Sequence, residues 1–132
     1  MVMKPEQFTE QAQAVLRNSQ ELVNRYHHTQ WDVEHILLAL LELEDGLPNA
    51  IVTDLNLSVD ALKARLHQFL DSVPKVMQGG QQIYTTPRVQ RLLENANEES
   101  QRLKDEFIGV EHLFIATVME PQGDSARVLK EF

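Results

Sequence analysis

The chain contains two copies of one pattern of residues, and this duplication limits its fold more than any other feature. Shifting the 132-residue sequence against itself by 77 positions aligns residues 9–55 with residues 86–132 without a gap. Eleven of the 47 aligned pairs are identical, where average composition gives about three by chance. The densest match joins Val33-Glu34-His35 to Val110-Glu111-His112, and in both copies a glycine follows the histidine after 11 residues. The duplication predicts two homologous structural units.

Each copy predicts a helix, a turn, a second helix, a turn and a short third helix. In the first copy Thr9 and Asp32 are suitable N-caps, and apolar residues recur at helical spacing after Thr9. The helix after Asp32 extends to Leu41 and is apolar nearly all round, so we expect it to be buried. Pro48 opens a third helix that reaches about Leu55.

The second copy predicts the same order of elements. Thr86-Pro87 combines an N-cap with a proline in the first turn, which is a clear helix start. A buried helix from Val110 to about Met119 follows, and a final short helix is expected after Gly123. No segment shows a strand pattern that competes with these helices.

A segment without a counterpart lies between the copies. Ser58 caps a predicted helix with apolar residues at helical spacing, and residues 74–82 form a long loop with turn residues. We therefore predict one all-α domain over residues 1–132, with repeat one at about 8–55, an inter-repeat helix and loop at about 58–83, and repeat two at about 84–132. The two repeats should pack face to face about a pseudo-twofold axis. Because the sequence stops within a helical stretch, we expect a piece of a longer protein.

The composition argues against several classes of function. The chain has no cysteine, which excludes disulfides, a thiolate nucleophile and cysteine-based metal centres. Its net charge is −8 and its pI is ≈ 5.0, which is unfavourable for binding nucleic acid or anionic lipid. The longest apolar run, Ile36 to Leu41, is far shorter than the ~20 residues of a membrane span. With no signal-peptide core at the N-terminus, a soluble cytoplasmic domain is expected.

The sequence shows no catalytic constellation. The sequence lacks the glycine-rich phosphate-binding motifs and the hydrolase motif. Its acidic clusters are interpreted as the solvent-exposed faces of helices. His35 and His112 should pack in the first turn of a buried helix and bond to the neighbouring backbone. At the end of the first helix, His27-His28 should carry an imidazolium that interacts with the helix dipole. The alternative is a small metal-dependent enzyme that uses His27, His28, His35 and His112.

Longer stretches of both copies resemble a known family. Residues 8–13, 33–41 and 44–46 in the first copy, and 84–88, 104–113 and 126–129 in the second, resemble the double Clp repeat of the amino-terminal domain of AAA+ unfoldases. Residues 70–76 and the Gly79-Gly80-Gln81-Gln82 loop resemble the ClpB-type disaggregase most. The resemblance covers essentially the whole chain.

This resemblance implies an all-α double repeat of about eight helices that precedes two ATPase modules and a coiled-coil middle domain in the full protein. The domain itself would need no catalytic residue, metal or cofactor, whereas the full-length protein would use ATP and magnesium as a homohexameric chaperone. The isolated domain would be monomeric and would capture unfolded or aggregated polypeptide. The substrate-binding positions that match the family are Thr9, Leu93, Asp105 and Glu111. Asn95 and Glu99 depart from the family's more apolar groove helix, which would weaken binding of unfolded chains.

Two alternatives remain within the family. The chain is then either an adaptor- or degron-binding N-domain of a ClpC- or ClpA-type protease unfoldase, or a standalone Clp-repeat docking protein. An adaptor-binding domain would recognise a defined protein partner, and a docking protein would lack affinity for peptides.

Overall fold

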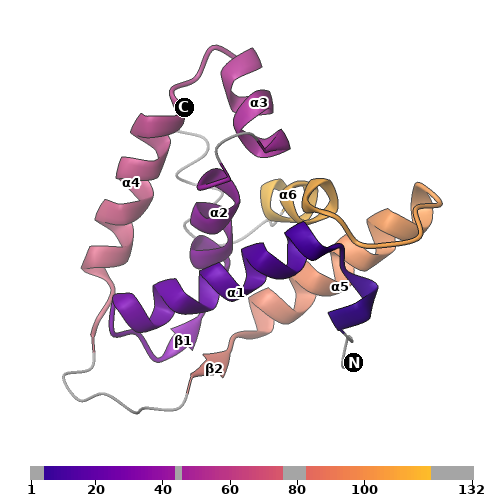
Figure 1. The fold of residues 1–132 in the computed structure, drawn as a ribbon. Coiled ribbons are helices and arrows are strands. Elements are labelled where there is room, and N and C mark those ends of the chain that lie inside the picture. The colour runs from indigo at the N-terminus through magenta and orange to yellow at the C-terminus, as the bar shows by residue number, and fades with distance from the viewer. Residues whose placement is uncertain (1–4, 44–45, 76–82, 120–132) are drawn as a thin grey trace.

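A computed structural model describes residues 5–43, 46–75 and 83–119. Over these residues the chain is mostly helical (Figure 1). The elements, in chain order, are a 3-10 helix η1 (Pro5–Gln7), α1 (Glu10–Arg25), β1 (Gln30–Trp31), α2 (Val33–Leu41), α3 (Leu47–Asp54), α4 (Val59–Ser72), β2 (Tyr84–Thr85), α5 (Pro87–Arg102) and α6 (Val110–Val118).

The predicted helix starts are confirmed. Thr9, Asp32, Ser58 and Thr86 are the N-caps of α1, α2, α4 and α5, and each side chain accepts a hydrogen bond from a backbone N–H of the first turn. These bonds satisfy amides that have no partner within the helix. Local sequence thus determines where the helices begin.

Two short strands correct the prediction that the chain has none. β1 and β2 pair in parallel, with Trp31 opposite Thr85, and an isolated bridge joins Phe8 to Ile108. A shift of 77 positions maps one pairing onto the other, because Trp31 corresponds to Ile108 and Phe8 to Thr85. Each repeat therefore pairs the residues before its first helix with those before the other repeat's second helix. This exchange is the pseudo-twofold arrangement that the duplication predicts.

The first helix of each repeat also ends in the same way. His27 and Lys104, which are equivalent at the offset of 77, have φ angles of 58° and 59°. In each case the next residue's N–H bonds to a carbonyl five residues earlier, at 2.9 Å for His28 and 2.8 Å for Asp105. Such a left-handed residue ends a helix and turns the chain sharply. The turn leads into the second helix of each repeat.

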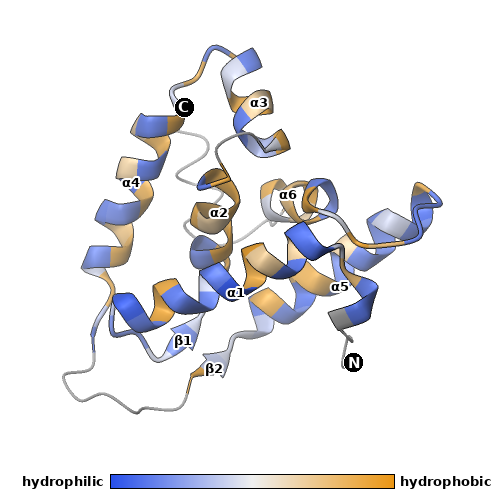
Figure 2. Cartoon of the chain, viewed as in Figure 1, coloured by the Kyte–Doolittle hydropathy of each residue, from blue (hydrophilic) through white to orange (hydrophobic). Residues whose placement is uncertain are grey.

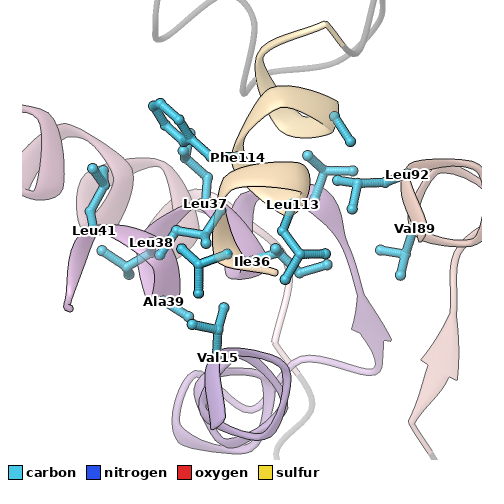
Figure 3. Close-up of a cluster of buried hydrophobic side chains, with 14 of the residues drawn as sticks. Val15, Ile36, Leu37, Leu38, Ala39, Leu41, Val89, Leu92, Leu113 and Phe114 are labelled. Carbon is cyan, nitrogen blue, oxygen red and sulfur yellow. The ribbon is translucent and has the colours of Figure 1, made fainter. Parts of the chain in front are cut away.

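The core lies between the repeats and is centred on α2. All nine residues of α2 are buried, as its apolar composition predicts. Figure 2 shows apolar residues nearly all round α2, whereas α1 and α5 are hydrophilic on their outward faces. In Figure 3 Ile36 from α2 and Leu113 from α6 lie beside Val89 and Leu92 from α5. Each fully buried aliphatic side chain contributes ~1.5–3 kcal/mol, so this shared interior holds the two repeats together.

The remaining helices follow the prediction closely. α3 and α6 end one residue before the predicted Leu55 and Met119. α4, the helix without a counterpart, packs against α2 and α3. The predicted final helix after Gly123 and most of the predicted loop 74–82 lie outside the described residues, so the expected total of about eight helices can be compared only in part.

Candidate functional site

Three of the four candidate binding residues come together at the start of α6. The backbone N–H of Thr9 donates to the carbonyl oxygen of Ile108 at 3.0 Å, which places the start of α1 beside the start of α6. Asp105 Oδ2 lies 2.8 Å from His112 Nε2. Glu111 Oε1 lies 3.5 Å from His112 Nδ1. We call Thr9, Asp105, Glu111 and His112 the α6 cluster.

His112 holds this cluster in place as a neutral ring. Its Nδ1 accepts a hydrogen bond of 2.8 Å from the backbone N–H of Gly109, so the ring proton is on Nε2 and is donated to Asp105. Because the lone pair of Nδ1 is already used, the contact with Glu111 is not an ion pair. The predicted role of His112, packing in the first helical turn with a bond to the backbone, is confirmed.

The carboxylates of the α6 cluster are open to solvent. The side chains of Asp105 and Glu111 are 49% and 47% exposed. Gly109 leaves room for the Glu111 carboxylate, since a Cβ at residue 109 would lie 2.2 Å from Glu111 Oε1. Both carboxylates are therefore accessible to a ligand at the positive end of α6.

A pocket of ≈ 550 Å³ lies beside the cluster, between η1 and the loop that joins α5 to α6. Asp105 belongs to its lining, and Phe107 adds an apolar side chain that is 46% exposed. The complete lining is Glu6, Gln7, Asn97, Ser100, Gln101, Asp105, Glu106, Phe107 and Ile108. We call this the α5–α6 pocket. Its polar and acidic walls suit a peptide backbone and cationic side chains.

Leu93, the fourth candidate, has a different environment. It is half-buried in the middle of α5 and packs against the hydrophobic core. The neighbouring stripe residues Val89, Leu92 and Ala96 are buried, so this face of α5 is mainly core. The polar departures Asn95 and Glu99 are also only half-buried.

In the first repeat, the counterpart of Glu111 is Glu34, and its carboxylate pairs with an arginine. Arg88 Nη2 donates to Glu34 Oε2 and Arg88 Nη1 to Asp32 Oδ1, both at 3.1 Å. The Thr86 hydroxyl donates to the same oxygen of Asp32 at 3.1 Å. The Glu34 side chain is only 2% exposed, against 47% for its counterpart Glu111. We call Asp32, Glu34, Thr86 and Arg88 the Arg88 network.

This network was not predicted from the sequence. The available signal was Glu34, the one carboxylate of the predicted buried helix 33–41, because a buried carboxylate needs a cationic partner. The sequence does not say which of the 12 basic residues supplies it. Burial raises the pKa of Asp32, although its bonds to Val33 N–H, Arg88 and Thr86 oppose this effect.

The histidines do not form a metal site. His28 and His35 bond to each other in the first repeat, at 2.9 Å between Nδ1 and Nε2, and His112 bonds to Asp105 in the second. Over residues 5–43, 46–75 and 83–119, no group of three His, Cys, Asp or Glu side chains is placed to hold a metal ion. The expected imidazolium at His28 is wrong, because the ring is buried and its burial lowers its pKa.

The described helices also bear on membrane insertion. In the part of the chain that the structure describes, none of them is both long and apolar enough to cross a bilayer.

Known sequences place the chain in one family. The model of the Clp repeat N-terminal domain matches residues 7–132. The chaperone protein ClpB of Bacillus cereus is 36% identical over 121 residues, which cover 89% of this chain and 14% of that protein. The ATP-dependent Clp protease ATP-binding subunit ClpC of Staphylococcus epidermidis is 30% identical over 124 residues, covering 91% and 14%. The chain thus spans about one seventh of the length of these curated relatives.

Solved structures share the fold at lower sequence identity. The Hsp104 N-terminal domain from Candida albicans has a TM-score of 0.85 and 19% identity, and the match covers 94% of this chain and 80% of that one. A ClpV N-domain solved in complex with a VipB peptide has a TM-score of 0.74 and 18% identity, covering 99% and 87%. Sequence and structure agree, and the chain belongs to the Clp repeat N-terminal domain family.

Proposed function

We propose that this chain is the N-terminal substrate-binding domain of a ClpB-like, ATP-dependent protein disaggregase. In this role it captures unfolded or aggregated polypeptide, and ATPase modules elsewhere in the protein thread the captured chain. ATP and magnesium then belong to the full-length protein, which acts as a homohexamer in the cytoplasm, and the domain itself catalyses no reaction. The ClpB relatives at up to 36% identity support this proposal.

The difference between the two repeats is the observation on which the proposed site rests. In the first repeat, Arg88 of the same chain pairs with Glu34. In the second repeat, Glu111 and Asp105 are half exposed next to the α5–α6 pocket. These two exposed carboxylates beside a pocket can accept further hydrogen bonds, so they suit a polypeptide ligand that supplies the hydrogen-bond donors. We therefore propose a binding surface of Thr9, Leu93, Asp105 and Glu111 on the side of the second repeat.

A titration with a labelled, permanently unfolded casein-like polypeptide tests this surface. NMR shifts should concentrate at residues 105–112, at Leu93 and at Thr9. The variant Glu111→Gln should weaken binding several-fold, since a charge-assisted hydrogen bond becomes a neutral one. Asp60→Asn is the matched control, because it removes one exposed carboxylate from the first turn of α4. Shifts confined to the first repeat, or equal effects of both variants, would contradict the site.

A second function is favoured by the ClpC relatives, whose matches cover 91% of the chain. Under it, the domain binds an adaptor protein or a degradation signal for a ClpC- or ClpA-type protease. A third candidate function is that of a standalone Clp-repeat docking protein, which binds a defined protein partner. The ClpV N-domain that was solved with a VipB peptide supports peptide binding in general without choosing among them. Capture of a folded adaptor, with no affinity for unfolded casein, would favour the adaptor function.

A further inference from the structure

The helix α4, which has no counterpart in the second repeat, covers one face of the first repeat. The hydroxyl of Tyr26, at the end of α1, bonds to His67 Nδ1 in the middle of α4. His28 Nε2 donates to the carbonyl oxygen of Leu70, in the last turn of α4, at 3.0 Å. Glu34, at the start of α2, lines a pocket of ≈ 320 Å³ together with Leu70 and other residues from the end of α4.

The covered face continues along α2. Glu34, Leu38 and Leu41 are spaced by four and three residues, so they lie on one side of the helix. In Figure 3 Leu38 and Leu41 lie on the side of α2 away from Val89 and Leu92 of α5. Both leucines are fully buried, and α4 packs against α2.

α4 meets this face with a stripe of leucines. Leu62, Leu66 and Leu70 recur at every fourth position and are buried. Because the last turn of α4 lies beside Glu34, the C-terminal end of α4 is next to the start of α2. The two helices therefore run in opposite directions, with the leucine stripe between them.

The equivalent face of the second repeat is open. At the offset of 77 positions, its residues are Leu103, Asp105, Glu111, Ile115 and Val118. We call these five residues the outer α6 face. Val118 is 49% exposed, whereas its counterpart Leu41 is fully buried, and Leu103 is 46% exposed. Asp105 and Glu111 are about half exposed, and Ile115 is half-buried.

The apolar part of the outer α6 face suits the same kind of helix. Ile115 and Val118 are branched aliphatic residues, as are their counterparts Leu38 and Leu41. A helix with aliphatic side chains at every fourth position can therefore bury them as α4 buries the leucines of α2. Met119, which is 67% exposed, extends the apolar area beyond Val118.

The polar part of the outer α6 face calls for a cation. Asp105, a carboxylate, replaces the hydrogen-bond donor His28. Glu111 replaces Glu34, and the residue equivalent to Arg88 is Gln11, which carries no charge. The end of α4 that lies beside Glu34 is its C-terminal end, so a ligand helix in the same orientation places its own C-terminal end at Glu111. Basic residues are also favoured there by the helix dipole.

We propose that the outer α6 face binds an amphipathic helix of a partner polypeptide, with aliphatic residues at every fourth position and an arginine or lysine at its C-terminal end. The helix lies on α6 as α4 lies on α2, and its cation pairs with Glu111 and Asp105. The net charge of −8 favours such a basic ligand. The inference rests on the proposed function, because Asp105 and Glu111 belong to both surfaces. It adds the conformation of the bound polypeptide and the participation of Ile115 and Val118.

A synthetic peptide with the sequence of residues 58–75 and the change Val73→Arg tests the outer α6 face. Val73 lines the pocket beside Glu34, so an arginine at this place in the bound peptide lies near Glu111. Titration into the ¹⁵N-labelled 132-residue chain should shift the amides of Ile115 and Val118, and the peptide should gain helicity by circular dichroism.

A second peptide, with Val73→Glu in place of Val73→Arg, measures the contribution of the cation. It should bind several-fold more weakly, and the difference should shrink in high salt. Equal affinity of the two peptides would overturn the proposal. So would shifts at Leu38 and Leu41 instead of α6, because the peptide would then replace α4 on the first repeat.

The chain variant Val118→Glu separates the outer α6 face from the rest of the proposed site. A carboxylate among the apolar contacts should weaken peptide binding about tenfold or more. Leu55→Glu, the matched control, changes an apolar residue that is 64% exposed on the first repeat and should leave the affinity unchanged. Equal effects of the two variants would contradict a helix on α6.

The casein-like polypeptide, measured on the same proteins, distinguishes the two proposals. If casein binds through Glu111 and the peptide does not bind, the helical ligand is refuted and the proposed function stands. If the peptide binds at α6 and casein does not bind, the helical ligand stands and the proposed function is refuted. If neither binds, both are refuted. Self-association that Val118→Glu abolishes, without peptide binding, would assign the face to a second copy of the chain and overturn the proposal.

Discussion

The guanidinium of Arg88, on α5 of the second repeat, lies 3.1 Å from the buried carboxylate of Glu34, on α2 of the first. Replacing Arg88 with methionine removes the cation that pairs with this buried carboxylate, which costs about 3–5 kcal/mol. Urea denaturation should show this loss. Arg91→Met, which removes an exposed arginine from the same helix, should change stability by less than about 0.5 kcal/mol.

The matching change at Glu34 tests whether the pair itself is responsible. Adding Glu34→Met to Arg88→Met removes the uncompensated charge, so most of the lost stability should return. A double variant no more stable than Arg88→Met would mean that the arginine acts through other contacts.

Leu38 and Leu55 provide a matched pair for the core around α2. Leu38 is fully buried, whereas Leu55 is 64% exposed after α3. Leu38→Ala should destabilise the domain by about 2–5 kcal/mol, because it leaves a cavity in the hydrophobic core. Leu55→Ala should cost less than about 0.5 kcal/mol. Thermal or urea unfolding measures both, and similar costs would show that α2 is not the centre of the core.

Glycine should stabilise the turn after α5. Lys104 has a φ angle of 59°, a conformation that costs a side-chain-bearing residue about 1 kcal/mol. Lys104→Gly should therefore raise the free energy of unfolding by up to about 1 kcal/mol. Gln101→Gly, inside α5, should lower it by a similar amount. Destabilisation by both changes would contradict the left-handed geometry.

Gly109→Ser should separate stability from binding. Serine is a good N-cap, so the stability of α6 should stay within a few tenths of a kcal/mol. Its Cβ, however, meets the Glu111 carboxylate, which must move away. We expect weaker binding of the unfolded polypeptide at unchanged melting temperature. Unchanged affinity would show that the position of Glu111 is not important for the proposed site.

The buried His35 predicts a loss of stability in mild acid. Burial lowers its pKa to about 4, below the ordinary value of ~6.5. The neutral ring therefore stabilises the folded chain above pH 6.5, and this contribution is lost as the pH falls from 6.5 towards 4. Each pH unit in this window costs up to about 1.4 kcal/mol. Urea midpoints measured between pH 7 and pH 4.5 should fall less steeply for His35→Gln.

Much of the fold could be predicted because its signals are local. Thr9, Asp32, Ser58 and Thr86 cap the helices that follow them, and the apolar composition of residues 33–41 predicts a buried helix. The helix periodicity needs only neighbours three and four residues away. For the candidate site, the offset of 77 positions identifies Glu34 and Glu111 as equivalent residues, without showing that their surroundings differ.

Sequence alone determined the two repeats, their helices and the buried position of α2. Only the tertiary structure decided that Arg88 pairs with Glu34 and that His28 bonds to Leu70. It also decided that the residues before the first helix of each repeat pair with those before the second helix of the other repeat. These contacts join residues 42 to 100 positions apart. Their partners are selected by how the repeats pack and by the need to satisfy every buried polar group, and no local pattern in the sequence records that selection.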